Sequence, residues 1–476
     1  MTARAAAGCA SVPRMELRCG QKPSGRRLVT VAAMVAAGWA CAPSGPRPAV
    51  PSNLLLITLD TLRADHVGCY GYRRPTTPAL DRFAATATRF EDVTCSMPTT
   101  LPSHVTIFTG LPPWLHGVSR NGQILESYPP SIFGLLAQLG ARTAAIVSAG
   151  VVESRFVKGL GFSEVTFDRR GEKVFQVNAA VVTDNALSWL QRHRGERFAL
   201  WLHYYDPHEP YEPPAEVAAQ FTAGYPGNLP DALATDWLVG LNEPAADAAL
   251  SAADRQHVVD LYDAELAFLD YQLGRVLEAV TELGLEGVTL VVIVADHGQA
   301  HGEASFWGHG ERLLEPVIKV PMLVHQPGQR AGQVVPEAVE TLDLLPSLLD
   351  WFGLPPIAGL PGRSLAGAAR GEPISPAERR VVARRSFPEQ PERAGLVVHR
   401  VGEKGTYYRE PDGELFHIGR VDGEGGLDGE NIFTAGAESS AWFASEVERY
   451  LAAAESGPAG TSPEDLEMLR ALGYVR

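Results

Sequence analysis

The sequence predicts an α/β fold in which helices cover both faces of a mostly parallel sheet. Three observations lead to this fold class: several apolar runs have the length of buried strands, helical patterns separate them, and a carboxylate directly follows several runs. The chain has 476 residues, 45% hydrophobic and 20% charged, which is globular composition. We expect a leader and linker over residues 1–50, a main domain over 51–371, and a small α+β C-terminal subdomain over 372–476.

The first fifty residues have the pattern of an export signal. Arg26 and Arg27 precede the mostly apolar residues 28–40, a run too short to span a bilayer comfortably, and small residues precede Cys41. Cys41 resembles the cysteine that is lipidated in bacterial lipoproteins, although Gly38 fits that pattern poorly. We expect export to the periplasm or cell envelope, with membrane contact only through a lipid anchor at Cys41. A disordered N-terminus without a signal is the alternative.

Four apolar runs are predicted to form buried parallel strands, at residues 53–59, 143–148, 197–203 and 289–295, with helical patterns at 131–140 and 251–283. Asp60, Asp206 and the pair Asp296-His297 follow three of these runs. The carboxyl ends of parallel strands meet at one edge of a sheet, where α/β proteins bind ligands. A single aspartate there is commonly a turn or cap residue. Three strand-end aspartates together, two of them with a histidine nearby, indicate a metal site.

After residue 371 the pattern changes to strand-like pieces between Gly/Pro-rich joints, at residues 380–383, 396–401 and 406–408. Ser462 and Pro463 predict the N-cap and first position of a last helix. These short pieces are the basis for the α+β subdomain.

Charge is divided unevenly along the chain. Lysine and arginine number 41 against 56 aspartate and glutamate, a formal net charge of −15. Residues 1–40 hold six basic side chains and one acidic side chain, so the remainder carries a net charge of −20. A body this acidic repels phosphate backbones, which argues against nucleic acid as a partner. An anionic substrate would instead need local positive charge from metal ions and helix-end amides.

A candidate nucleophile lies in the segment from Thr99 to Gly110, where hydroxyl side chains precede an apolar helical pattern. Pro102 fits the first turn of this helix. A nucleophile at a helix N-terminus lies where main-chain N–H groups and the helix dipole favour anions. The segment is therefore suited to chemistry on an anionic substrate.

Further motifs, in their order along the chain, resemble the sulfatase family of the alkaline phosphatase superfamily. They are Leu59–Gly71, Ala295–Gly298, Phe306–Gly310, Glu315–Val324, Asp343–Asp350, Gly359–Leu365 and Leu469–Tyr474. Each motif alone is weak, but their order is specific, and the resemblance runs from about residue 52 to the C-terminus. It implies an alkaline-phosphatase-like fold, a sulfatase-like catalytic domain over residues 51–371, and metal-dependent hydrolysis of a small anionic ester.

One departure from the family pattern matters most. Family sulfatases carry Cys or Ser in Cys/Ser-x-Pro-x-Arg and oxidise that residue to formylglycine, whereas the matching stretch here runs from Thr100 to His104. Threonine is a secondary alcohol and cannot yield an aldehyde. Cys95 does not restore the motif, because Met97 stands where proline is needed. The resemblance is therefore to a variant without formylglycine.

A threonine at this position resembles the nucleophile of the superfamily's phosphodiesterases and phospho-group transferases, in which a metal-bound threonine attacks the substrate. Those phosphodiesterases also use an asparagine some twenty residues later to stabilise the charged oxygen, and Asn121 follows Thr100 by 21 residues. We expect Asn121 and main-chain N–H groups near residue 101 to hold developing charge. An ordinary turn at Asn121 is an equal alternative.

The metal motifs also depart from those of calcium sulfatases, which supply only oxygen. The chain has Asp60-Thr61 and Asp296-His297, so one carboxylate is lost and an imidazole is gained. Imidazole suits zinc or manganese better than calcium. Asp60, Thr100, Asp296 and His297 make one four-ligand site, and the resemblance implies that its ion lowers the pKa of the Thr100 hydroxyl.

A second metal ion is the next expectation, held by Asp206, His208 and His309, since an Asp and two His do so in two-metal relatives. His208 and His309 are alternatively acids that assist the leaving group, or structural polar residues near the site. The leading interpretation is thus an exported hydrolase of phosphodiester or phosphonate esters. The alternatives are a sulfate-ester hydrolase without formylglycine, a phosphoethanolamine or phosphoglycerol transferase, and an inactive binding lipoprotein.

Overall fold

The computed structural model describes residues 50–125, 128–171 and 175–374, and then residues 379–386, 393–400, 403–410, 413–420, 431 and 438–454. The predicted signal with Cys41 and the predicted helix at Ser462 lie outside these residues. Among the described helices, none is long and apolar enough to cross a membrane.

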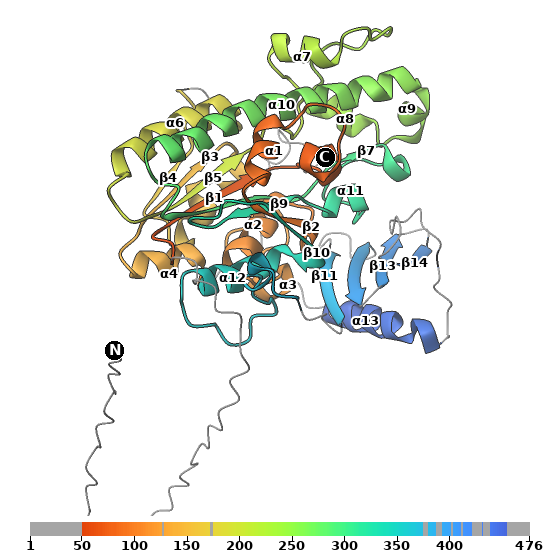
Figure 1. Ribbon diagram of the computed structural model, residues 1–476. Helices are drawn as coiled ribbons and strands as arrows, with labels where there is room; N and C mark the ends of the chain where they lie inside the picture. Colours follow the sequence, from red (N-terminus) through yellow and green to blue (C-terminus); the bar gives the residue numbers. More distant parts are fainter. Residues whose placement is uncertain are drawn as a thin grey trace, which may run out of the picture. The chain divides into compact units, whose positions relative to one another are not determined.

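An eight-stranded sheet forms the centre of the main domain (Figure 1). Its strands are β1 (Asn53–Leu59), β2 (Thr88–Thr94), β3 (Arg142–Val147), β4 (Glu164–Thr166), β5 (Phe198–Tyr204), β6 (Thr289–Ala295), β9 (Met322–His325) and β10 (Gln333–Glu340). Their order in the sheet is β10-β2-β9-β6-β1-β5-β3-β4. Only β9 runs antiparallel to its neighbours, β6 and β2, so the sheet is mostly parallel, as predicted.

Helices cover both faces of this sheet, with α6 and α10 on one face and α2, α4 and α12 on the other (Figure 1). The helices are α1 (Pro78–Ala84), α2 (Thr100–Thr109), α3 (Pro113–His116), α4 (Ile132–Gln138), α5 (Ser154–Val157), α6 (Ala179–His193), α7 (Ala215–Phe221), α8 (Thr235–Gly240), α9 (Pro244–Ala249), α10 (Ala252–Glu282), α11 (Glu315–Ile318), α12 (Leu344–Trp351) and α13 (Glu438–Ala454). Because helices lie on both sides, all seven residues of β1 are buried, and this explains its continuous apolar sequence.

The four predicted strands match β1, β3, β5 and β6, and the predicted helices match α2, α4 and α10. Helix α10 begins where its cap residue predicts, because the Ser251 hydroxyl accepts the Asp254 N–H while the Asp254 carboxylate accepts the Ser251 N–H. Strands β2, β4, β9 and β10 were not predicted. In β10 the burial pattern is irregular and three of its residues are charged or polar, so it shows no continuous apolar run.

The C-terminal part contains a separate antiparallel sheet of β11 (Arg379–Ser386), β12 (Ala394–Arg400), β13 (Glu403–Glu410) and β14 (Gly413–Arg420). Helix α13 packs against β12. A short hairpin of β7 (Ala300–His301) and β8 (Trp307–Gly308) follows β6 in the main domain. The sheet with its helix is an α+β arrangement, while the exact limits of the predicted domains stay a prediction.

Candidate metal and catalytic site

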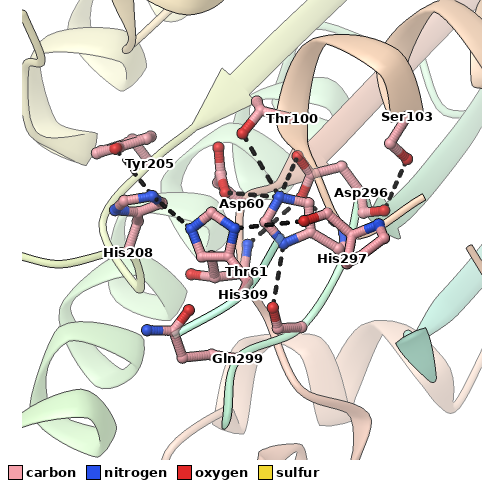
Figure 2. Close-up of polar contacts among 12 residues, drawn as sticks. Asp60, Thr61, Thr100, Ser103, Tyr205, His208, Asp296, His297, Gln299 and His309 are labelled. Atoms are coloured by element: carbon pink, nitrogen blue, oxygen red, sulfur yellow. Dashed lines mark hydrogen bonds and ion pairs between the residues drawn. The ribbon is translucent and has the colours of Figure 1, made fainter. Parts of the chain in front are cut away.

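Two adjacent strands carry the two central carboxylates. Strands β1 and β6 are paired in parallel so that Leu59 lies beside Ala295. The next residues, Asp60 and Asp296, therefore leave the sheet side by side at its carboxyl edge, and both are wholly buried. Thr61 links them, because its N–H donates to Asp296 Oδ1 over 3.3 Å. Figure 2 shows these side chains converging with Thr100 and His297.

The two carboxylates need a cation if both are ionised. Burial raises the pKa of Asp60 well above its usual value, and the charge of Glu209 raises it further. Burial, followed by the charge of Asp60, raises the pKa of Asp296 in the same way. Asp60 Oδ1, Thr61 Oγ1 and Asp296 Oδ2 are buried without a hydrogen-bond partner. Buried oxygens of this kind are either costly or ligands.

His297 completes this group as a nitrogen ligand. Its Nδ1–H donates to the Gly298 carbonyl over 3.0 Å, which leaves the lone pair on Nε2. Burial lowers the pKa of His297 well below its usual value, so the ring is neutral. Nε2 lies 3.8 Å from Asp60 Oδ1, 3.6 Å from Asp296 Oδ2 and 3.5 Å from Thr100 Oγ1. Ligands at about 2.1 Å around a tetrahedral ion are about 3.4 Å apart, so these residues fit a metal such as zinc.

Thr100 is the first residue of α2 and is wholly buried, with its hydroxyl facing the carboxylates. The amide of Asn121 lies beside this helix end. Its Oδ1 accepts the Leu101 N–H over 2.8 Å, which fixes the orientation of the amide. Asn121 Nδ2 is buried and has no partner.

The contact of Asn121 with Leu101 corrects one expectation. Main-chain N–H groups near residue 101 were expected to hold developing charge on the substrate, but the Leu101 N–H already donates to Asn121, and Pro102 has no N–H. The side-chain amide of Asn121 is a further donor beside this helix end, because its Nδ2 is buried and has no partner. Asn121 and Gly122 do form a turn, as the alternative expected, but the Asn121 side chain is only 2% exposed, and its role stays a prediction.

Two further buried histidines, His203 and His104, contact Asp60 and the main chain of Thr100. His203, in β5, has Nε2 within 3.3 Å of Asp60 Oδ2. His104 stands where family sulfatases have arginine, and its Nδ1–H donates to the Thr100 carbonyl over 2.7 Å. Burial lowers the pKa of both histidines, to about 3 for His203 and well below the usual value for His104. His203 was missed because it appeared only as the last residue of an apolar run.

His208, Glu209 and His309 form a second group of ligand atoms, all within 4.8 Å of one another. Nε2 of His208 lies 2.9 Å from Nε2 of His309. Burial lowers the pKa of His208 to about 3 and that of His309 to about 4. The His309 ring also lies beside His297, with 4.5 Å between ring centroids, so the two groups adjoin.

Asp206 does not lie with these residues, contrary to the sequence prediction. Its Oδ1 accepts the Ala179 N–H over 2.8 Å, at the N-terminus of α6. Burial raises its pKa to about 7. Among the described residues, it belongs to none of the groups that could hold a metal ion, and Glu209 takes the expected place. The sequence signal for Glu209 was its position next to His208, three residues after Asp206.

Comparisons with known proteins agree with this geometry. The sequence model of the family described as Sulfatase matches residues 52–354. An arylsulfatase of Clostridium perfringens is 22% identical over 364 residues, covering 63% of this chain and 74% of the relative. Human N-sulphoglucosamine sulphohydrolase is 29% identical over 356 residues, covering 68% and 67%.

Solved structures with the same fold include a phosphonate monoester hydrolase from Silicibacter pomeroyi. It superposes with a TM-score of 0.65 at 22% identity and covers 84% of this chain and 94% of its own. The similarity shows the fold, and the family match spans well over half of the chain. The chain therefore belongs to the sulfatase family of the alkaline phosphatase superfamily, and it is a hydrolase of ester bonds.

Proposed function

We propose that the protein hydrolyses phosphodiester or phosphonate esters, with Thr100 as nucleophile and a zinc or manganese ion held by Asp60, Asp296 and His297. The observation that carries this proposal is the position of Thr100. Its hydroxyl lies 3.5 Å from His297 Nε2, at a helix N-terminus, with the unpartnered Nδ2 of Asn121 nearby. A nucleophile, an oriented ligand set and a charge-stabilising donor thus occupy one place.

Asp60, Asp296 and His297 would hold the ion, and when bound it would supply a positive charge that favours loss of the Thr100 proton and binding of an anionic ester. His297 stays neutral and oriented through its Nδ1–H contact with Gly298, and His203 orients Asp60. Thr100 Oγ1 attacks phosphorus and displaces the ester oxygen, and Asn121 Nδ2 donates to an oxygen that gains charge. Water then attacks the phosphorylated Thr100, which releases the acid product and restores the hydroxyl.

The ligand set supports zinc or manganese over calcium. Calcium prefers six to eight oxygen ligands, whereas this group includes an imidazole nitrogen and few oxygens. Metal content of the purified protein, measured by elemental analysis, tests this choice. Calcium as the tightly bound ion would overturn it.

The test of the reaction is a panel of aryl phosphate monoester, phosphodiester, phosphonate monoester and sulfate substrates, with Thr100→Ala as the variant. We expect diester or phosphonate turnover that falls by at least a hundredfold in Thr100→Ala, since the nucleophile is removed. Thr109→Ala, at the other end of α2, is the matched control. Full turnover by metal-loaded Thr100→Ala would contradict the proposal.

Sulfate-ester hydrolysis is the second candidate, because the curated relatives named above are sulfatases. A sulfate monoester carries one negative charge, as a phosphodiester does, so the same site could hold either. Thr100 and the neutral His104 favour the phosphorus substrate, because neither residue follows the formylglycine motif. Preference for sulfate by orders of magnitude in the panel would reverse this order.

We also propose that the protein is exported and lipidated at Cys41, on the strength of the leader pattern alone. Mass spectrometry of protein expressed in a bacterium tests this. The expected N-terminal residue is Cys41 carrying a lipid, and Cys41→Ser should abolish the lipid mass. An intact N-terminus would contradict the proposal.

A further inference from the structure

A chain of hydrogen bonds leads from the interior of the central sheet to the first residue of α2. In the pairing of β1 with β5, Thr58 lies beside His203, two residues after Trp201. Residues two apart on a strand share a face, so Thr58 and Trp201 point to the same side of the sheet. Both are wholly buried there, and the His104 side chain of α2 lies against them.

The direction of each proton in this chain follows from what the groups can donate and accept. The indole nitrogen of Trp201 only donates, and it lies 2.8 Å from Thr58 Oγ1. Thr58 accepts this bond and directs its own hydroxyl proton at Nε2 of His104, also over 2.8 Å. On the other side of the ring, Nδ1 lies 2.7 Å from the Thr100 carbonyl, which only accepts. His104 therefore carries its proton on Nδ1, and every donor in the chain points toward Thr100.

The other tautomer of His104 does not fit these surroundings. It would leave a lone pair on Nδ1, which lies 2.7 Å from the Thr100 carbonyl oxygen and 3.6 Å from Asp296 Oδ2, and such acceptors repel one another. It would also place an N–H at Nε2 against Thr58, whose hydroxyl proton would then have no acceptor in the chain. The Thr58 hydroxyl thus favours the tautomer that holds the Thr100 carbonyl.

Packing leaves the His104 ring little freedom to move. Its centroid lies 5.1 Å from a ring centroid of Trp201 and 5.9 Å from that of Phe108, and all three side chains are buried. A hydrogen-bonded ring enclosed in this way is a rigid support for the first turn of α2. The carbonyl and the hydroxyl of Thr100 belong to one residue, so fixing the first restrains the second, which lies 3.5 Å from His297 Nε2.

We propose that His104 is a positioning residue for Thr100, and that Thr58 and Trp201 set its orientation and the place of its proton. The proposal rests on the proposed function, because the residue that is positioned is the nucleophile. His104 is wholly buried and acts through the main chain of Thr100 rather than on the substrate. A slightly displaced nucleophile loses rate without losing binding, so disturbing the chain should lower kcat while KM stays the same.

Two substitutions of Thr58 separate the hydrogen bond from packing. Thr58→Val keeps the shape of the side chain and removes the hydroxyl, whereas Thr58→Ser keeps the hydroxyl and removes a methyl group. We expect Thr58→Val to lower kcat by about tenfold or more with KM within about twofold of the wild type, and Thr58→Ser to retain most of the wild-type kcat. Each variant is saturated with metal, and its metal content is checked by elemental analysis.

Thr143→Val is the matched control. Thr143 is a buried threonine of β3, and its hydroxyl donates to the Gly161 carbonyl over 2.7 Å, so the substitution removes a comparable hydrogen bond away from the chain that ends at Thr100. We expect it to keep the wild-type kcat. A larger fall of kcat in Thr58→Ser than in Thr58→Val would show that Thr58 only fills space, and would overturn the proposal.

Nuclear magnetic resonance of protein with isotope-labelled histidine ring nitrogens observes the proton directly and needs no activity. The His104 signals are identified by their absence from His104→Asn. In the wild type they should show a protonated Nδ1 and an unprotonated Nε2. A proton on Nε2 would overturn the order of donors and with it the proposal.

The outcomes distinguish this proposal from the proposed function. If Thr100→Ala abolishes turnover while Thr58→Val keeps the wild-type kcat, Thr100 stands as the nucleophile and the positioning role of His104 is wrong. If Thr100→Ala keeps full turnover, the proposed function fails, and the positioning role fails with it whatever the histidine signals show.

Discussion

The two polar atoms of the Asn121 amide have different contacts. Oδ1 accepts the Leu101 N–H and so holds the N-terminus of α2, while the buried Nδ2 has no partner among the described residues. A structural role would need only the first atom, and a catalytic role would need the second. The two roles can therefore be separated by substitution.

Asn121→Asp keeps an oxygen for Leu101 but replaces the donor with an acceptor. We expect kcat to fall by about 10²- to 10³-fold in both Asn121→Asp and Asn121→Ala, since one donor to the developing charge is lost. Steady-state kinetics with the preferred substrate measures this, with metal content checked in parallel. Near wild-type kcat in Asn121→Asp would show that Asn121 only holds Leu101.

At the scale of elements, one aspartate joins two helices. Asp270, in α10, accepts the N–H groups of Ala79 and Leu80 in the first turn of α1, over 2.7 and 2.9 Å. This contact satisfies two N–H groups that a helix start leaves without partners in its own helix. Burial raises the pKa of Asp270 to about 6 from a usual value of 3.8.

Because its pKa is raised, the contribution of Asp270 to the free energy of unfolding depends on pH. Between about pH 4 and pH 6 the unfolded chain releases the Asp270 proton while the folded chain retains it, so the contribution of Asp270 to the free energy of unfolding falls as pH rises. We expect Asp270→Asn to destabilise the protein more at pH 4.5 than at pH 7.5, in urea denaturation at both pH values. An equal loss at both would contradict this assignment.

The sequence predicted those elements whose physical signal is local. Strands β1, β3, β5 and β6 are buried on both faces, so they are apolar throughout, and α10 carries its own cap at Ser251. Strand β9 has four residues, which is too short for a distinct pattern. Helix α13 was missed as well. No residue at its start gave an N-cap signal as clear as Ser251 gives for α10.

The first metal group was predictable because its members follow strands that are adjacent in the sheet. Asp206 was predicted to join the second group, but the structure does not bring it together with His208 and His309, for a related reason. It also follows a strand, but its side chain turns to the first N–H of α6, a contact between residues 27 apart that no strand-end rule contains. Which of Asp206 and Glu209 faces the histidines depends on the path of the loop after β5, and sequence spacing does not define that path.

At the scale of the whole molecule, the C-terminal sheet contacts the segment that follows His309. Lys404 of β13 pairs with Glu315, and Arg393 pairs with Glu311 over 3.0 Å. The Lys404 side chain is only 9% exposed, so the first pair is well shielded from water. The sheet thereby restrains the segment that positions His309.

Lys404→Met should loosen this segment and lower kcat/KM by roughly tenfold to a hundredfold, because a small displacement of a site residue has effects of this size. Lys158→Met, an exposed lysine elsewhere in the main domain, is the matched control and should behave as the wild type. Steady-state kinetics of the two variants is the measurement. Unchanged kinetics in Lys404→Met would show that the contact does not influence the site.

Metal removal should affect the stability of the whole chain. Without a cation, the raised pKa values of Asp60 and Asp296 mean that the folded protein loses stability as pH rises and these carboxyls ionise. We therefore expect metal-free protein to show a larger drop in Tm, relative to metal-loaded protein, at pH 8 than at pH 5. Thermal unfolding of dialysed samples measures the difference, and a larger drop at pH 5 would contradict it.

The complete burial of Thr100 has a consequence for how the protein reaches its active form. A side chain enclosed at the start of α2 cannot be reached by a modifying enzyme once the chain has folded. If Thr100 attacks as its own hydroxyl, as proposed, it needs no such modification, and folding with metal uptake would be sufficient for activity. Purified protein that is unfolded in denaturant and refolded with metal should regain its activity in vitro, without a modifying enzyme.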